Sequence, residues 1–214
     1  MKSIVVAGSK GIGKAIADEL HQISSEVIAT STSELDTADI EDVKSFVSIQ
    51  GSTDILVLNT GGPPSKDFFD IQEDEWYKYY NQLFYSFVYI LQNLKVNNDG
   101  YIFLISSHLI KEPTQSMSLS VSYRLALSSI LKLLTKHFAS KNISCINIAP
   151  GPIKTKRLES LVGNLSEFES KLPFRRAGSV EEISKFVRSI IENNIKYLSG
   201  VTINFDGGES NYIL

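Results

Sequence analysis

Short apolar runs rich in β-branched residues alternate with segments of helical periodicity along the whole chain. The runs predict six strands, at residues 4–7, 27–30, 55–59, 101–106, 144–148 and 202–205. The segments between them predict five helices, at residues 12–22, 40–48, 73–95, 119–139 and 180–192. Several strands are apolar throughout, as expected when helices cover both faces of a parallel sheet. The pattern therefore predicts a single α/β domain over residues 1–214, built on a doubly wound parallel sheet.

A glycine-rich segment, Val6-Ala7-Gly8-Ser9-Lys10-Gly11-Ile12-Gly13, joins the first predicted strand to the first predicted helix. Glycines at this junction let backbone N–H groups and the helix N-terminus approach a pyrophosphate. A turn that binds nothing is the alternative interpretation. We favour dinucleotide binding in a Rossmann-type fold, because the segment lies in the first βα unit. The predicted cofactor-binding residues here are Gly8, Ser9, Lys10, Gly11, Ile12 and Gly13.

Four later segments carry a resemblance to a known family. They are residues 58–63 (Leu-Asn-Thr-Gly-Gly-Pro), 149–155 (Ala-Pro-Gly-Pro-Ile-Lys-Thr), 173–183 and 199–208. With the glycine loop before them, the chain resembles the short-chain dehydrogenase/reductase family, whose loop usually reads T-G-x-x-x-G-I-G. Ala7 departs from that loop; either the turn differs there, or Gly8 replaces the first glycine in a shorter loop. The resemblance implies further cofactor contacts from Asn59, Thr60, Gly61, Pro150, Gly151, Ile153 and Thr155.

The end of the second strand bears on the choice of dinucleotide. An acidic residue there binds the ribose hydroxyls of NAD, whereas this chain has Thr30 and Ser31. Lys10 stands where NADP-preferring members of the family tend to carry a basic residue. A cation and hydroxyl donors suit a 2′-phosphate, so we expect NADP(H), with NAD(H) as the alternative.

The resemblance also implies catalytic positions. The family moves a hydride between nicotinamide and a carbonyl or alcohol carbon, with a serine orienting the oxygen and a tyrosine and lysine handling the proton. Ser107 matches the serine, but the tyrosine position holds Ser120 and the lysine position holds Arg124. A serine hydroxyl is a poor general acid. An arginine keeps its charge and can bind ribose hydroxyls, but it does not release a proton near neutral pH.

Other residues are candidates for the missing roles. Tyr123 neighbours Arg124, although it is rotated about 60° from Ser120 on an ideal helix; packing or a subunit contact is the alternative. His108, next to Ser107, is the other candidate, because an imidazole can act as an acid near neutral pH. The alternative is an ordinary loop histidine with no catalytic role. The family's asparagine position falls on Leu83 when counted from Trp76, and Asn81 lies about 200° away from it around the helix.

Two readings of the chain follow. The first is an NAD(P)(H)-dependent oxidoreductase acting on a small carbonyl or alcohol, with Tyr123, His108 or ordered water moving the proton. The second is a dinucleotide-binding protein with weak or no activity that serves as a sensor or partner subunit. We favour the enzyme, because a bound cofactor supplies the hydride chemistry itself.

Composition excludes several other classes. The formal charge of -3 and the lack of a basic run argue against nucleic acid or an anionic membrane surface as partner. The single cysteine, Cys145, fits a buried thiol in a reducing compartment, and no secretion signal precedes the first strand, so we expect a cytoplasmic protein. No Cys/His/Asp/Glu grouping has the spacing of a metal site.

Two further expectations concern surfaces. The helices at 73–95 and 119–139 carry more aromatic and apolar residues than one sheet face needs, and in the family such helices pair between subunits. We therefore expect a homodimer or homotetramer through them. Residues 158–172 are expected to form a mobile substrate lid.

Overall fold

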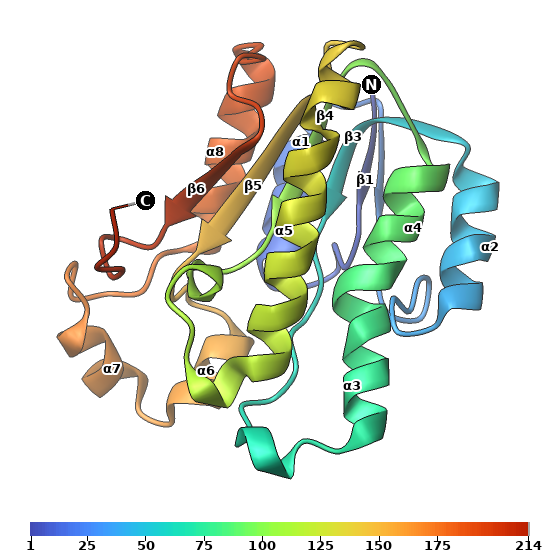
Figure 1. Ribbon diagram of the computed structural model, residues 1–214. Coiled ribbons are helices and arrows are strands. Elements are labelled where there is room, and N and C mark those ends of the chain that lie inside the picture. The colour runs from blue at the N-terminus through green and yellow to red at the C-terminus, as the bar shows by residue number, and fades with distance from the viewer. Residues whose placement is uncertain (214) are drawn as a thin grey trace.

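Six parallel strands form one sheet in the computed structural model, which describes residues 1–213 (Figure 1). They are β1 (Lys2–Val5), β2 (Glu26–Ala29), β3 (Ser52–Leu58), β4 (Lys95–Ile105), β5 (Ser144–Pro150) and β6 (Val201–Phe205). Their order across the sheet is β2-β1-β3-β4-β5-β6. The predicted strands and the doubly wound α/β fold are confirmed, with β4 beginning at Lys95 rather than at Tyr101.

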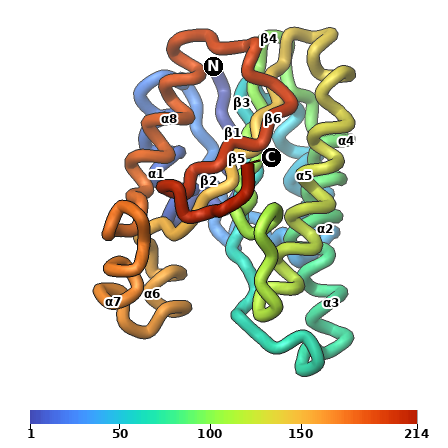
Figure 2. The backbone as a smooth tube through the Cα atoms, turned by 60° about the vertical axis from the view of Figure 1, so that its left-hand side comes forward, coloured from blue at the N-terminus to red at the C-terminus, as the bar shows by residue number. Residues whose placement is uncertain are grey.

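Helices cover both faces of the sheet, as Figure 2 shows from the side. One layer holds α1 (Gly11–Leu20) and α8 (Val180–Glu192), and the other holds α2 (Ile40–Gln50), α4 (Ser86–Asn93) and α5 (Ser118–Ala139). Each layer has its own buried core against the sheet. Ile16 and Ile183 belong to the first core, and Val43 and Leu127 belong to the second. Burial of these apolar faces is the main force holding the layers together.

The helix predicted at 73–95 is interrupted. Residues from α3 (Glu73–Tyr80) lead through a π-helical turn, η2 (Asn81–Tyr85), into α4, which ends at Asn93. A π-turn holds an extra residue per turn. Side chains after the turn therefore face directions that an ideal helical count from Trp76 does not give.

The carboxyl ends of the strands lie together at one edge of the sheet. From β1 the chain first turns outward to β2 and then crosses back to β3, so the direction of winding reverses between β1 and β3. Ligands of such sheets bind at this reversal, outside the carboxyl ends. Two short helices, α6 (Lys156–Val162) and α7 (Leu165–Lys171), lie beyond the same edge; α7 falls within the predicted lid, and α6 begins two residues before it.

The lid segment has a small apolar core of its own. Leu158, Leu172 and Ala177 are buried together, and Val162 and Phe168 pack against them. This core is separate from the two cores of the sheet. Movement of the segment as a lid stays a prediction.

Cys145 lies in the middle of β5, fully buried. Burial raises the pKa of its thiol to about 12. A thiol of this kind is inert rather than nucleophilic. In the part of the chain that the structure describes, no helix is both long and apolar enough to cross a membrane.

Candidate active site

The glycine loop between β1 and α1 turns at Ala7 and Gly11, which have φ angles of 50° and 53°. Ala7 is thus in the left-handed conformation that normally favours glycine. Both of its backbone groups are bonded: its N–H donates to the Thr30 hydroxyl at 3.1 Å, and its carbonyl accepts from Asn59 Nδ2 at 3.2 Å. The alanine that departs from the family's loop is therefore held in the glycine conformation by its neighbours.

Two other glycines permit close packing in the loop. A Cβ on Gly13 would lie 2.3 Å from the Ala7 carbonyl oxygen and 2.6 Å from Asn59 Nδ2. One on Gly8 would lie 2.8 Å from the Ala29 Cβ. Since no real side chain tolerates such distances, Gly8 is needed for its small size, and the left-handed turn is made by Ala7.

The N-terminus of α1 is free to receive an anion. Lys10 is the residue before the helix, and its side chain makes no capping bond to the first turn. Ser9, Lys10 and Gly11 are exposed to solvent. Uncapped N–H groups and the helix dipole favour a phosphate at such a position. The residues present therefore fit the pyrophosphate of a dinucleotide.

The end of β2 differs from the sequence-based expectation. Thr30 is buried, and its hydroxyl braces Ala7. Ser31 donates from its backbone N–H and its hydroxyl to Glu34 Oε2, at 2.8 and 2.7 Å. These hydrogen bonds lower the pKa of Glu34. An acidic residue, Glu34, therefore lies beside Ser31 after all. The Ser-x-x-Glu spacing in the sequence could have predicted this contact.

The segment after β3 is braced from three sides. Asn59 bonds the glycine loop, the Thr60 carbonyl accepts from Arg124 Nη2 at 3.0 Å, and the Gly61 carbonyl accepts from Gln82 Nε2 at 3.0 Å. Gln82 was not among the sequence candidates, which considered Asn81 and Leu83. Asn81 donates instead to Ala38 O at 3.5 Å, and Leu83 is buried. The π-turn explains this, since it changes which residue faces the loop.

The segment after β5 reaches the glycine loop. Thr155 caps α6 by accepting from Leu158 N at 3.3 Å, and its Cγ2 lies 3.6 Å from the position of a Cβ on Gly11. Ile153 is buried and forms an isolated bridge with Gly178. Pro150 pairs with Phe205, and a Cβ on Gly151 would lie 2.7 Å from the Asp206 Cβ. Of the family-derived cofactor residues here, Thr155 therefore lies beside the glycine loop, Ile153 pairs with Gly178, and Pro150 and Gly151 lie against β6 and its loop.

Arg124 is a buried cation held mainly by backbone oxygens. Its Nη1 donates to the carbonyls of Ile105 at 2.9 Å and Ser106 at 3.4 Å, and its Nη2 donates to Thr60 O. Its Nε donates to the Ser120 hydroxyl oxygen at 3.3 Å. Burial, and secondly the charge of Arg157, lower the pKa of Arg124 to about 10. Arg124 thus stays charged near neutral pH and joins the ends of β3 and β4 to α5.

Ser107 lies at the end of β4 and begins the 3-10 turn η3 (His108–Ile110). Its hydroxyl oxygen accepts from Leu109 N at 3.3 Å, which leaves the hydroxyl hydrogen available to another acceptor. Ser107 and Ser120 thus share one property. In both, a protein donor occupies the oxygen while the O–H is free to point elsewhere.

Tyr123 is directed toward α3. Its hydroxyl donates to the Trp76 carbonyl at 3.1 Å, and its ring packs edge-on against Trp76 and Tyr80. Burial raises the pKa of its phenol. Both features oppose a role as acid and agree with the packing alternative.

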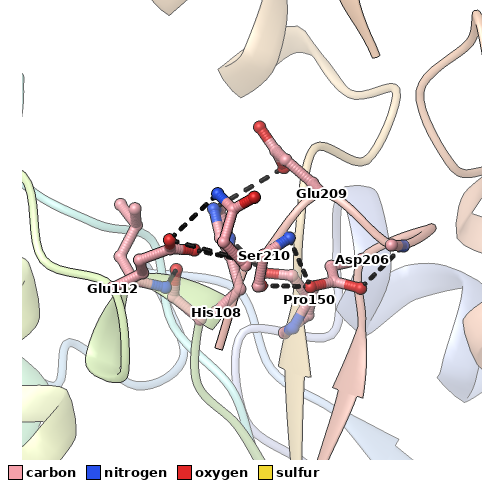
Figure 3. A network of polar contacts seen from close by, with 10 residues as sticks. His108, Glu112, Pro150, Asp206, Glu209 and Ser210 are labelled. Carbon is pink, nitrogen blue, oxygen red and sulfur yellow. Dashed lines mark hydrogen bonds and ion pairs between the residues drawn. The ribbon is translucent and has the colours of Figure 1, made fainter. Parts of the chain in front are cut away.

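His108 is engaged by the C-terminal segment (Figure 3). Its Nδ1 lies 3.0 Å from the Pro150 carbonyl oxygen, and its Nε2 lies 3.6 Å from Glu209 Oε2. Burial raises the pKa of Glu209. The same segment is bonded further by Glu112, whose carboxylate accepts from Asn211 N at 3.1 Å. His108 therefore links β4 to the loop after β6. Within residues 1–213, no cluster of three or more potential metal ligands occurs.

Comparison with known proteins agrees with this architecture. Residues 35–210 match the family model described as Enoyl-(Acyl carrier protein) reductase. The chain is 28% identical over 234 residues to a 3-oxoacyl-[acyl-carrier-protein] reductase of Buchnera aphidicola, covering 96% of each sequence. A short-chain dehydrogenase family protein from Francisella tularensis has the same fold, with a TM-score of 0.86, 23% identity and coverage of 97% and 98%.

A second solved structure is L-sorbose reductase from Gluconobacter frateurii in complex with NADPH and L-sorbose. Its TM-score is 0.85, with 21% identity and coverage of 99% of this chain and 97% of that one. The fold, the glycine loop and the matching family model together define a class. The chain belongs to the short-chain dehydrogenase/reductase family.

Proposed function

We propose that this protein is an NADP(H)-dependent oxidoreductase that interconverts a small carbonyl compound and its alcohol. One observation carries the proposal: Arg124 Nε donates to the Ser120 oxygen, so the Ser120 hydrogen is free to donate to a substrate oxygen. A neighbouring guanidinium also favours negative charge on that oxygen. Ser120 and Arg124 together would thus perform the polarising part of the work that the family assigns to tyrosine and lysine.

The cofactor is proposed to bind along the carboxyl edge of β1 and β3. When bound, NADPH supplies a hydride to the carbonyl carbon. Ser9 to Gly13 would hold the pyrophosphate, and Thr155 faces the same loop. Lys10 is exposed and forms no ion pair with any described residue, so it is free to meet a 2′-phosphate. The NADPH seen in L-sorbose reductase supports this choice, whereas the carboxylate of Glu34 opposes it.

The proton is proposed to come from water. During reduction the carbonyl oxygen gains a negative charge that hydrogen bonds from Ser107 and Ser120 would stabilise, and a proton must then be added to that oxygen. Neither serine nor Arg124 is a suitable acid near neutral pH. Tyr123 donates to Trp76, and His108 is engaged by Pro150 and Glu209. Solvent is the remaining source.

A pH profile tests this proton source. We expect kcat to be flat between about pH 6 and 9 and to fall as the pH nears 10, where Arg124 loses its charge. An inflection between about pH 5 and 8, the range in which an imidazole titrates, would contradict the proposal. If the His108→Gln variant removed that inflection, His108 would be the donor.

A pair of serine variants tests the proposed reaction. NADPH and NADH are titrated by fluorescence, and turnover is then measured against a panel of carbonyl compounds. We expect Ser120→Ala to lower kcat by roughly 100-fold, while Ser122→Ala, an exposed serine on the same helix, leaves it unchanged. Failure to bind either dinucleotide, or equal rates for both variants, would contradict the proposal.

A second candidate function rests on Arg124 itself. Four of its five N–H groups donate hydrogen bonds to protein oxygens. An arginine with a purely structural role would show the same pattern. The alternative is a dinucleotide-binding protein without significant turnover, acting as a sensor or partner subunit. Tight NADPH binding with no turnover of any carbonyl compound would favour it.

We also propose that the protein forms a homodimer or homotetramer through α3, α4 and α5. Tyr77 on α3 and Leu125 and Leu133 on α5 expose 66%, 46% and 75% of their surface. Large apolar side chains exposed on neighbouring helices favour contact with a second copy. Sedimentation of a monodisperse monomer would contradict this assembly.

A further inference from the structure

Two arginines from different helices approach the segment after β3 without an acidic partner. Arg124 on α5 donates to Thr60 O at 3.0 Å, and Arg157 on α6 donates to the Pro63 carbonyl. Neither forms a salt bridge with any residue among 1–213. By contrast, Arg176 pairs with Glu182, and Arg188 pairs with Glu19 and Glu192.

The two guanidinium groups and Ser120 converge on one point beside Gly62. A Cβ placed on Gly62 would lie 3.6 Å from Arg157 Nη2, 3.8 Å from Ser120 Oγ and 3.9 Å from Arg124 Nη2. Glycine leaves this point open. It is therefore a small space lined by two cations and a hydroxyl.

The charge there is uncompensated. Arg124 is only 9% exposed, and one of its Nη2 hydrogens has no acceptor among the described residues. Burial lowers the pKa of both arginines, and the charge of Arg157 lowers that of Arg124 further. A buried charge is unfavourable unless an opposite charge compensates it, and the like charge of Arg157 nearby adds to the cost for Arg124. Arg157 remains accessible to solvent, so an anion can enter from its side.

We propose that this space is an anion subsite and that the substrate is an oxo acid, whose carboxylate binds Arg157 and Arg124 while its carbonyl oxygen meets Ser120. A carboxylate suits the site because it is planar, small and able to accept paired N–H donors from a guanidinium. The inference rests on the proposed carbonyl reduction. It adds that the substrate is negatively charged.

Binding to the oxidised complex tests the subsite without turnover. The protein is saturated with NADP⁺, which cannot reduce a carbonyl, and titrated by calorimetry with acetoacetate or its neutral methyl ester. We expect acetoacetate to bind at least about tenfold more tightly than the ester, a factor worth about 1.4 kcal/mol. Equal affinities, or no binding of acetoacetate, would overturn the subsite.

Two variants locate the anion. Arg157→Gln should abolish the preference for acetoacetate, while Lys156→Gln, which removes a charge from the exposed neighbouring residue, should leave it unchanged. Gly62→Ala makes only ordinary contacts but fills the space, so it should weaken acetoacetate binding about tenfold without lowering Tm. A preference that survives both Arg157→Gln and Gly62→Ala would overturn the assignment.

Turnover separates this inference from the proposed function. With NADPH, preferential reduction of acetoacetate supports both. Equal kcat/KM for the acid and its methyl ester would keep the reductase and reject the subsite. Acetoacetate binding that Arg157→Gln removes, with no reduction of either compound, would keep the subsite and count against the reductase.

Discussion

The glycine loop and the Ser120–Arg124 site lie at the same edge of the sheet, yet they are held in different ways. The loop is positioned by short backbone contacts around Ala7 and by the absence of side chains at Gly8 and Gly13. The Ser120–Arg124 site depends on one long side chain that crosses from α5 to the ends of β3 and β4. Short local contacts thus position the glycine loop, and the side chain of Arg124, which extends from α5 to the strand ends, positions the Ser120–Arg124 site.

The largest expected effect is at Arg124. Arg124→Met leaves the carbonyls of Thr60 and Ile105 without their donor, and although it also removes a buried charge, we expect the free energy of unfolding to fall by about 3 kcal/mol. Turnover should be lost at the same time. Urea unfolding measures the change, with Lys136→Met on the exposed face of α5 as the control. A loss below about 0.5 kcal/mol would show that the carbonyls find other donors.

The glycine loop should respond to added volume instead. Gly13→Ala places a methyl group 2.3 Å from the Ala7 carbonyl oxygen. We expect the backbone to shift at a cost of about 1–3 kcal/mol, with a fall in NADPH affinity of at least about tenfold. Thermal unfolding and a fluorescence titration measure the two effects. Unchanged NADPH affinity in a folded Gly13→Ala variant would remove the loop from the proposed cofactor site.

A smaller effect is expected at Glu34. Its carboxylate stands beside Ser31, where it repels a 2′-phosphate. Glu34→Gln should therefore increase the affinity for NADPH by roughly a few-fold, because solvent screens this exposed carboxylate, and should change the affinity for NADH little. The ratio of the two dissociation constants is the measurement. An equal change for both dinucleotides would place the 2′-phosphate elsewhere.

The smallest expected effect is a gain at Ala7. Its φ of 50° costs a non-glycine residue about 1 kcal/mol, so Ala7→Gly should relieve strain. The more flexible unfolded chain offsets part of that gain. We expect the variant to be more stable by less than about 1 kcal/mol in urea unfolding, with NADPH affinity retained. A loss of stability would show that the bonds to Thr30 and Asn59 favour alanine.

Sequence patterns predicted the fold well because the relevant signals are short-ranged. Apolar runs marked all six strands, and helical periodicity marked α8 at residues 180–192, where the structure shows both halves of a capping box between Ser179 and Glu182. The interrupted helix at Asn81–Tyr85 was not predicted, since apolar residues continue on both sides of the π-turn and the extra residue only shifts the phase of the pattern. For the same reason Gln82 was missed as the residue that contacts Gly61.

The candidate site was predictable only in part. The resemblance to the family implied Ser107, Ser120 and Arg124 as catalytic candidates, but the partners of these side chains depend on distant segments. Helical spacing alone left Tyr123 and His108 open as acids, and the structure directs them to Trp76 and to Pro150 and Glu209. A side chain's direction follows from what packs around it, which a linear pattern does not contain.

By itself, then, the sequence determined a doubly wound sheet with a glycine loop at its first turn, and its resemblance to the family implied a serine and an arginine at the tyrosine and lysine positions. The sheet and the loop depend on periodicity and spacing within one or two elements. Only the tertiary structure decided that Ala7 adopts the left-handed turn, that Glu34 folds onto Ser31, and that Arg124 and Arg157 meet beside Gly62. Each of these requires groups from separate segments to be brought within a few ångströms, and packing of the whole fold supplies that proximity.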